Sequence, residues 1–347
     1  MISQSRCRLV VAAFTLFALA ACAPKAREQR VVWPAPPDRP RLEWIKNYYS
    51  QDDFPKTGAQ VFMEGFLGKP PLVYFARPFG IAAKADQQLV YVSDTDAKEL
   101  RIFDLANNQI RRLNAITSFG RPLGITFDGA GNLYVCDAHY KSVMVFGPDN
   151  QPRFTIGGPD DLEVPAFVEV NDRLGRVYVS DGKAGRVVVF DKQGKKLFTF
   201  GELGGESGMF RAPQGMAIDK ENRVFVADLL NARVQVFDAD GKFLYMFGER
   251  ADLPGGFEGP KDMAFDSEGN LHIVDSRKAL LLSYQADGRL LLYTGGQKQS
   301  TSPVGFAMPI SIFIDKNDRI YIADAFNMRF SVWQYLSEAY LAKNPIK

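Results

Sequence analysis

The sequence predicts an all-β fold, a six-bladed β-propeller built from four-stranded antiparallel blades. Three regularities along the 347 residues predict it. A short apolar run ends on aspartate six times, at intervals of 43 to 49 residues, a period typical of propeller blades. A proline precedes each aspartate by 15 or 16 residues, and an aromatic residue follows each by nine. The repeated aspartates, which mark the blades, are Asp94, Asp137, Asp181, Asp228, Asp275 and Asp324.

Each unit within residues 77–336 has the same order of segments. A first strand follows the proline, and a polar turn such as residues 128–132 ends it. The second strand is the run that ends on aspartate, and the third ends on the aromatic residue. A turn such as residues 191–194 then leads to a fourth strand. Because the apolar residues alternate with a period of two and Asp, Gly and Asn separate the runs, helical repeats are excluded.

The sixth unit ends after its third strand, at residues 331–335, so its blade lacks a fourth strand. Residues 41–49 alternate in polarity just before the repeats begin. We expect them to complete the sixth blade and close the ring, since an open propeller would leave unpaired strand edges. The region 41–76 therefore holds the closing strand and a short helical segment near residues 59–68, expected to cross one face of the disc. Residues 337–347 form a C-terminal tail.

The first 21 residues are typical of an export signal. A basic start precedes an apolar run of about 13 residues, Leu9 to Ala21, which is too short for the roughly 20 residues of a membrane-spanning helix. Leu19-Ala20-Ala21-Cys22 resembles a bacterial lipobox, which implies cleavage before Cys22 and acylation of that residue. The alternative is an ordinary secretory signal in which Cys22 has no role.

A lipid anchor at Cys22 would place the protein outside the cytoplasm. Residues 22–40 are rich in proline and are expected to form a tether that reaches about 50 Å at roughly 3.1 Å per residue. By resemblance to enterobacterial sorting, Ala23 after the cysteine favours the outer membrane.

The charge argues against nucleic-acid binding, and the cysteine content argues against an intramolecular disulfide. The formal charge is 42 − 40 = +2, and removal of residues 1–21 with Arg6 and Arg8 leaves 40 − 40 = 0. A neutral surface argues against nucleic-acid binding. Cys7 leaves with the signal and Cys22 is acylated, so Cys136 remains without a disulfide partner. We expect Cys136 to be a small buried residue.

Several short motifs carry a family resemblance. Pro78-Phe79-Gly80-Ile81-Ala82 opens a unit, residues 224–228 read VFVAD, and Asn231-Ala232-Arg233 and Asn327-Met328-Arg329 follow two of the aspartates. With the lipobox and tether, the chain resembles the NHL-repeat six-bladed propeller lipoproteins of Gram-negative bacteria. The Asn-x-Arg motif is complete only in units four and six. We expect an arginine five residues after an aspartate to bridge the turn between strands two and three, which makes the aspartates structural markers.

The innermost strands line the axis of a propeller. Positions two and four after each proline hold mostly small residues and are expected to face the channel. Phe167 and Phe313 are large exceptions there, and the acids Glu169 and Asp262 are charged ones. Two carboxylates suit a divalent cation such as calcium or magnesium, with Lys261 beside them as a third member of the candidate site. The alternative is that channel water solvates the carboxylates or that Asp262 pairs with Lys261. No other cofactor is expected.

No catalytic constellation is evident. Phosphate-binding loops, Cys-x-x-Cys pairs and Gly-x-Ser-x-Gly elbows are missing from the sequence, and the two histidines, His139 and His272, fit a loop and a packed strand. The leading hypothesis is a non-enzymatic, lipid-anchored binding module or scaffold at the cell envelope that recognises a protein or an extracytoplasmic polymer. Long connections at 157–164, 201–212, 248–260 and 295–308, all on one side of the disc, would carry the recognition. The alternative is a metal-assisted, lactonase-like or lyase-like enzyme that uses Glu169 and Asp262.

Overall fold

The structure is a computed structural model that describes residues 30–69, 71–113, 118–253, 255–295 and 299–345. The predictions for the signal and for Cys22 therefore lie outside the described residues. Contacts divide the chain into two units, residues 1–31 and 32–347, and the second contains the propeller. None of the described helices is long and apolar enough to span a membrane.

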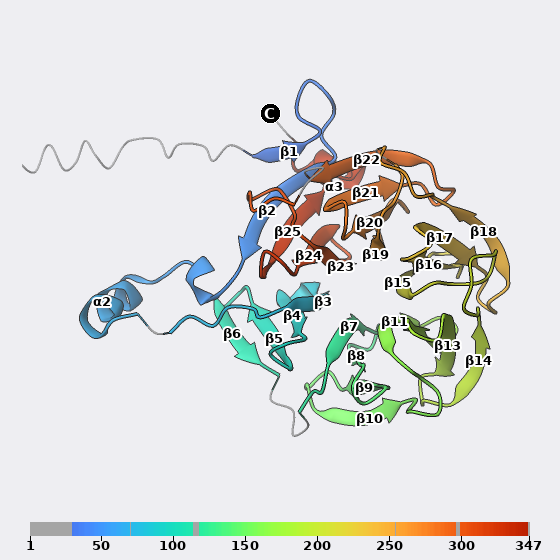
Figure 1. Ribbon diagram of the computed structural model, residues 1–347. Coiled ribbons are helices and arrows are strands. Elements are labelled where there is room, and N and C mark those ends of the chain that lie inside the picture. The colour runs from blue at the N-terminus through green and yellow to red at the C-terminus, as the bar shows by residue number, and fades with distance from the viewer. Residues whose placement is uncertain (1–29, 70, 114–117, 254, 296–298, 346–347) are drawn as a thin grey trace, which may run out of the picture. The chain divides into compact units, whose positions relative to one another are not determined.

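The prediction of six four-stranded antiparallel blades is confirmed (Figure 1). Blade 1 contains β3 (Pro78–Lys84), β4 (Leu89–Asp94), β5 (Glu99–Asp104) and β6 (Gln109–Arg112). Blade 2 contains β7 (Pro122–Phe127), β8 (Leu133–Asp137), β9 (Ser142–Phe146) and β10 (Pro152–Ile156). Blade 3 contains β11 (Pro165–Asn171), β12 (Arg176–Asp181), β13 (Arg186–Asp191) and β14 (Lys196–Phe200).

The remaining blades follow the same pattern. Blade 4 contains β15 (Pro213–Ile218), β16 (Val224–Asp228), β17 (Arg233–Phe237) and β18 (Phe243–Phe247). Blade 5 contains β19 (Pro260–Phe265), β20 (Leu271–Asp275), β21 (Leu280–Tyr284) and β22 (Leu290–Gly295). Blade 6 contains β23 (Pro309–Ile314), β24 (Arg319–Asp324), β25 (Arg329–Tyr335) and, from the other end of the chain, β2 (Leu42–Tyr48). The first strand of each blade lies nearest the axis, and apolar side chains fill the space between adjacent sheets.

The N-terminal strand closes the ring, as predicted. β2 pairs antiparallel with β25, so that Trp44 lies opposite Trp333. A further short strand, β1 (Val31–Trp33), extends this sheet beyond β2. The Trp33 carbonyl accepts from the Arg41 amide, and the Trp33 indole donates to the Tyr293 carbonyl at 2.6 Å. The prediction that residues 22–40 form an extended tether is therefore wrong for the last part of this range. There β1 pairs with β2, and Trp33 is hydrogen-bonded to the propeller.

The strand directions give the disc two different faces. In every blade the proline that starts the first strand pairs with the aspartate that ends the second, for example Pro165 with Asp181. The turns after the aspartates and the six connections between blades therefore lie on one face, which we call the connection face. These connections are residues 49–77, 113–121, 157–164, 201–212, 248–259 and 296–308. The opposite face, which we call the turn face, holds the remaining hairpin turns.

The six aspartates fix the connections to the blades. Each carboxylate is fully buried and accepts hydrogen bonds from backbone amides just before the proline of its own blade. Asp94, for example, accepts from the amides of Ala76 and Arg77, both at 2.8 Å. The equivalent donors are Gly120 and Arg121 for Asp137, Glu163 and Val164 for Asp181, Arg211 for Asp228, Glu258 and Gly259 for Asp275, and Ala307 and Met308 for Asp324. This contact explains the constant spacing between proline and aspartate.

Arginines beside the aspartates extend this network into the connections. In blade 4 the Arg233 Nε lies 2.9 Å from an Asp228 oxygen, and its Nη2 donates to the carbonyls of Glu206 and Met209. Arg329 makes the equivalent contacts in blade 6. In blade 1, where Glu99 stands five residues after the aspartate, Arg101 lies 3.4 Å from Asp94. The arginines therefore hold the connections as well as the turn that we expected them to bridge.

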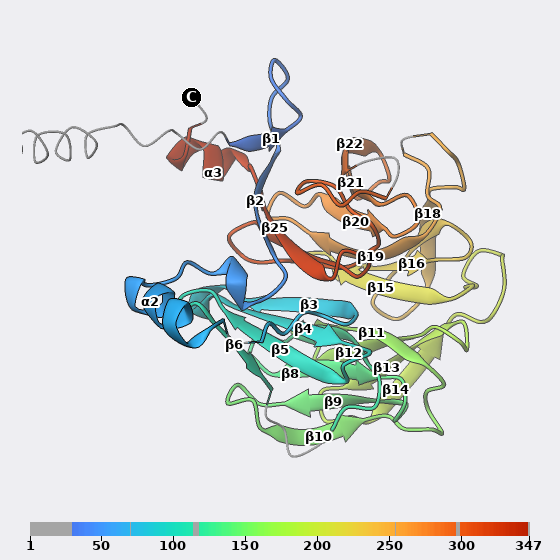
Figure 2. The same ribbon diagram turned by 60° about the vertical axis from the view of Figure 1, so that its left-hand side comes forward.

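A helix within the first connection lies outside the ring. The connection contains a 3₁₀ turn, η1 (Gln51–Asp53), and α2 (Gly58–Leu67), and no residue of α2 is buried. Both views place α2 beside blade 1 rather than over the disc (Figures 1 and 2), so the prediction that it crosses a face is wrong. The reason is that Phe54 and Phe75, on either side of the helix, both pack against Phe103. The chain thus leaves the ring and returns at one place.

Two short elements complete the described chain. η2 (Ala85–Gln87) lies in the first turn of blade 1, and α3 (Glu338–Lys343) follows β25. Ser337 caps α3, and the Glu338 carboxylate contacts Arg39 and Arg41. Cys136 on β8 is fully buried, as predicted, and burial raises the pKa of its thiol.

Candidate functional site

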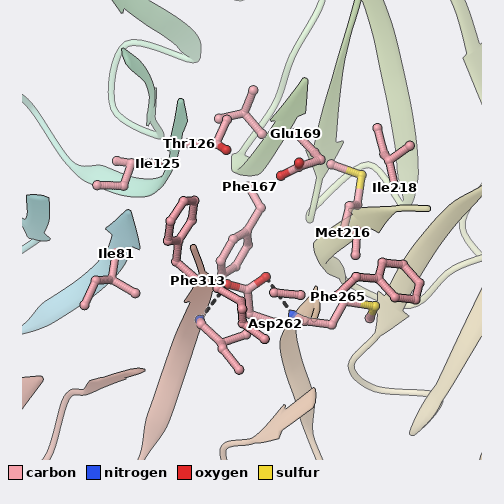
Figure 3. A pocket seen from close by; sticks show the side chains of 16 residues that line it. Ile81, Ile125, Thr126, Phe167, Glu169, Met216, Ile218, Asp262, Phe265 and Phe313 are labelled. Atoms are coloured by element: carbon pink, nitrogen blue, oxygen red, sulfur yellow. Dashed lines mark hydrogen bonds between the residues drawn. The ribbon is translucent and has the colours of Figure 1, made fainter. Parts of the chain in front are cut away.

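A cavity of about 190 Å³ lies on the axis, between the first strands of the six blades (Figure 3). Most of its lining is apolar, and its polar side chains are Thr126, Glu169 and Asp262. The last residues of β15, β19 and β23 belong to the lining, which places the cavity toward the turn face. The sequence interpretation therefore named both acids of this cavity correctly but did not predict its apolar character.

The predicted lining face was incomplete. Phe167 and Asp262 at position two and Glu169 and Phe313 at position four line the cavity as predicted. Side chains at positions three and five, such as Ile81 and Phe265, line it as well. The blades stand edge-on to the axis, so the side chains of an inner strand point toward the blades on either side. Side chains from both sides of the strand therefore reach the channel. Where position two is glycine, close contact with the next blade explains its small size. A Cβ on Gly80 would lie 2.4 Å from the Leu123 carbonyl oxygen of the next blade.

Asp262 joins two blades at the cavity wall. It is buried on β19, and its Oδ2 accepts from the Ser311 hydroxyl at 2.7 Å and from the Ile312 amide at 3.0 Å, both on β23. Its Oδ1 accepts from the Met263 amide. Burial raises the pKa of Asp262 to about 7, although these hydrogen bonds favour the charged form.

Lys261 points away from the cavity, on the opposite side of β19 from Asp262. Its ammonium donates to the Gln214 Oε1 at 2.6 Å and lies 5.5 Å from the centre of the Phe79 ring. Burial lowers the pKa of Lys261 to about 8, against the opposing effect of the Asp262 charge. Lys261 and Asp262 form no direct ion pair among the described residues. The structure thus separates the lysine from the two acids with which the sequence interpretation grouped it.

Glu169 enters the cavity from β11, on the other side of the channel. Its side chain is half-buried, and its carboxyl group points into the same space as that of Asp262 (Figure 3). Burial raises the pKa of Glu169 to about 8, and the negative charge of Asp262 acts in the same direction. Burial and the charge of Asp262 therefore both favour the neutral form of the Glu169 carboxyl group near pH 7.

The donor set of the cavity does not fit a divalent cation. Hard cations require six or more oxygen ligands and ionised carboxylates. Both oxygens of Asp262 already accept protein hydrogen bonds, and the raised pKa of Glu169 favours its neutral form. In the described ranges, no three His, Cys, Asp or Glu side chains converge in a way that could hold a metal ion.

A buried serine, histidine and aspartate lie together in blade 5, an arrangement that the sequence did not reveal. His272 Nε2 lies 2.9 Å from an Asp266 oxygen, and Nδ1 lies 2.8 Å from the Ser283 hydroxyl. All three are buried, so no substrate reaches them. In blades 2 and 6 the hydroxyls of Tyr134 and Tyr321 contact the equivalent turn aspartates. The histidine therefore replaces a repeated structural tyrosine.

Exposed apolar side chains gather on the connection face. They lie on the connections and on the turns after the aspartates. Among the described residues of the turn face, no large apolar side chain is more than half exposed, and Leu174 reaches 43%. The exposed apolar residues of the connection face, apart from the first connection, are Tyr140, Leu203, Leu230, Leu253, Phe326 and Met328.

Comparison with known proteins supports the fold. A family model described as a 6-bladed beta-propeller matches residues 218–304, about a quarter of the chain. No curated protein matches the sequence significantly. Solved structures with the same fold include a gluconolactonase from Xanthomonas campestris, at 14% identity and a TM-score of 0.60, over 90% of this chain and 100% of that one. They also include a virginiamycin B lyase from Staphylococcus aureus, at 12% identity and a TM-score of 0.56, over 75% and 95%.

A protein of unknown function from Bacteroides thetaiotaomicron is also similar. It is 19% identical, with a TM-score of 0.63 over 75% of this chain and 70% of that one. At these identities the likeness establishes a shared propeller architecture and nothing about activity.

The raised pKa values of the two channel acids predict a pH-dependent stability. In the unfolded chain both carboxyl groups have a pKa near 4, whereas in the folded protein the pKa is about 7 for Asp262 and about 8 for Glu169. At pH values between these limits the native state therefore binds more protons than the unfolded state. We therefore expect their contribution to the free energy of unfolding to fall as the pH rises from 5 to 8. Each group is limited to about 1.4 kcal/mol per pH unit.

Urea unfolding of the wild type, Glu169→Gln and Glu202→Gln at pH 5, 6, 7 and 8 checks this expectation. Glu202 is an exposed acid on the connection face and serves as the control. Glu169→Gln should flatten the decline, whereas Glu202→Gln should keep it. An unchanged slope in Glu169→Gln would contradict the expectation.

Proposed function

We propose that this chain is a non-enzymatic binding module of the cell envelope that recognises a protein partner through its connection face. In this proposal it is an NHL-type propeller lipoprotein, acylated at Cys22 and held at the outer membrane. The observation that carries the proposal concerns the large apolar side chains that are more than half exposed. Among the described residues, all of them belong to a connection between blades or to a turn after one of the aspartates. Large apolar patches on soluble proteins mark interaction sites.

Buried contacts order parts of this face, which favours binding. The buried aspartates fix the start of every first strand, and Arg233 and Arg329 contact carbonyls of two long connections. A surface that is ordered before the partner arrives loses less conformational entropy on association. Leu203, in the connection that Arg233 contacts, is therefore presented at little entropic cost.

Co-purification from gently solubilised membranes tests this proposal. We expect a stoichiometric protein partner with the wild type, and its loss with Leu203→Ser combined with Leu253→Ser. A matched control combines Leu174→Ser on the turn face with Leu197→Ser on an outer strand, and it should retain the partner. Absence of any stoichiometric partner, together with turnover of a lactone substrate, would overturn the proposal.

The alternative function is a lactonase-like or lyase-like enzyme that acts in the channel. Two observations favour it, namely the carboxyl groups of Glu169 and Asp262 that point into one cavity, and the shared fold with a gluconolactonase and a lyase. This alternative predicts lactone turnover that Glu169→Gln abolishes. It also predicts a thermal shift on addition of calcium, zinc or magnesium, which the donor set does not favour.

A further inference from the structure

We propose that α2 is a docking helix that inserts into an apolar groove of a partner protein. The proposal rests on the proposed binding function and deepens it, because it assigns the principal contact to one element and states the chemistry of the partner. α2 belongs to the first connection, residues 49–77, whose two ends meet the ring at the connection face.

The apolar side chains of α2 have no place to pack within the described part of the chain. Phe62, Phe66 and Leu67 are 72%, 81% and 70% exposed, and Val61 and Met63 are exposed as well. Phe62 and Phe66 are four residues apart, as are Met63 and Leu67, so both pairs lie along one side of the helix. Anchors at this spacing are typical of helices that bind in a groove.

The helix is well formed without a partner. Thr57 caps its start, and the side chain of Gln60 returns the hydrogen bond in a capping box. The Lys56 ammonium lies 2.9 Å from Glu64 and 2.6 Å from Asp52, so it links the helix to η1. A helix that is already ordered presents its anchors without a large entropic cost on binding.

The base of the helical segment is fixed to the ring. Phe54 and Phe75 are buried, and the Gln51 side chain donates to the Pro71 carbonyl across the base of the loop. Both views show α2 projecting from the edge of the disc (Figures 1 and 2). Beyond α2, Val73 and Tyr74 are also exposed and extend the apolar surface toward the ring.

The charges of this connection favour a protein over a lipid surface. Helices that lie in a membrane interface carry lysine and arginine on their polar side. The polar side of α2 holds Gln60 and Glu64, and Lys56 is paired with that glutamate. Residues 49–77 contain three acids and three bases, so 3 − 3 = 0 and nothing attracts them to anionic lipid.

The partner site can be described from the shape of the helix. Ten residues at about 1.5 Å each require a groove about 15 Å long. It should contain two adjacent apolar pockets for Phe62 and Phe66. The hollow of about 730 Å³ beside α3 in a second copy does not meet this requirement, because it is lined mainly by polar residues such as Asp315, Lys316 and Asn317.

Site-specific photocrosslinking in intact cells tests the proposal with the full-length protein. A benzoylphenylalanine is placed at position 62, 66, 253 or 154, where position 154 is the exposed Phe154 of the outer strand β10 and serves as the control. We expect positions 62 and 66 to give the same discrete product with one other protein and position 154 to give none. The crosslinked peptides of that protein should map to neighbouring apolar residues of a single groove.

Other outcomes overturn the proposal in distinguishable ways. A product from position 253 without one from positions 62 and 66 leaves the proposed function intact and removes the role of α2. No product from any of these three positions contradicts both. A product with a second copy of the chain, or flotation of the purified, unlipidated protein with phosphatidylethanolamine–phosphatidylglycerol vesicles that requires Phe62 and Phe66, assigns α2 to self-association or to lipid instead.

A variant separates binding from folding. Phe62→Ser with Phe66→Ser should change the melting temperature by less than about 2 °C, because exposed positions contribute little to stability. It should weaken binding of the crosslinked partner at least tenfold. Phe154→Ser should leave binding unchanged. Unchanged binding by the double variant would overturn the proposal.

Discussion

Replacing Asp228 with alanine is expected to destabilise the protein by about 3–5 kcal/mol, the cost typical of breaking a buried ion pair. The carboxylate is fully buried and accepts from the Arg211 amide at 2.7 Å, the Asn231 side chain at 2.7 Å and the Arg233 Nε at 2.9 Å. Its removal leaves a buried guanidinium without a counter-ion and releases the connection before Pro213. Burial raises the pKa of Asp228, which shows that the charge is costly to bury and depends on these partners.

A double-mutant cycle with Arg233→Ala tests the origin of this effect. If the two residues act as a pair, the stability losses of the two single variants should sum to more than the loss of the double variant. We expect this difference, the coupling energy, to be at least about 1 kcal/mol. Urea unfolding measures all four proteins. Asp96→Ala, an exposed aspartate of the equivalent turn in blade 1, should stay within about 0.5 kcal/mol of the wild type. Additive losses would show that the aspartate acts through the backbone amides alone.

Replacing Gly80 with alanine is expected to cost about 3 kcal/mol or more, the upper end of the overpacking range. An added Cβ would lie 2.4 Å from the Leu123 carbonyl oxygen and 2.9 Å from the Ile125 amide nitrogen. Both atoms belong to the backbone of β7, so relief requires the inner strands of blades 1 and 2 to move apart. Because neighbouring inner strands contact each other around the whole ring, such a movement would disturb the channel.

Gly158→Ala is the matched control for this substitution. A Cβ at Gly158 has no neighbouring atom within 4 Å, so the variant should unfold within about 0.5 kcal/mol of the wild type. Thermal and urea unfolding of both variants provide the comparison. Equal stability of Gly80→Ala and Gly158→Ala would mean that the inner strands separate freely, contrary to the close contact described above.

The blade pattern could be predicted from the sequence because each repeated residue performs a local task. The aspartate and proline of one blade lie opposite each other across a single strand pair, so their spacing stays constant. Closure by residues 41–49 could be predicted because the sixth blade lacked a strand. The ion pair between Arg101 and Asp94 could not be predicted. It forms because the two side chains lie on the same side of the adjacent strands β4 and β5, and not because the arginine stands at the repeated spacing from the aspartate.

The candidate site was predicted in part. Glu169 and Asp262 do reach the channel, but strand alternation alone could not show that Lys261 lies against Phe79 or that apolar residues dominate the cavity. The helix near residues 59–68 was predicted, but its place was not. An apolar helix is usually covered, and only the pairing of Phe54 and Phe75 with Phe103 shows that the segment remains outside the ring.

The pairing of β2 with β25 has a consequence for the order in which the chain acquires its structure. Trp44 and Trp333 pair although they are 333 − 44 = 289 positions apart in the sequence, so bringing these strands together as a free loop would cost about 5 kcal/mol of chain entropy. Blades 1 to 5 lower this cost, because each completed blade already carries the chain part of the way around the circle. β2 is nevertheless synthesised before the strands of blades 1 to 5 and gains its partner β25 only after them. Until then β1 can cover one edge of β2, and the edge that pairs with β25 stays open.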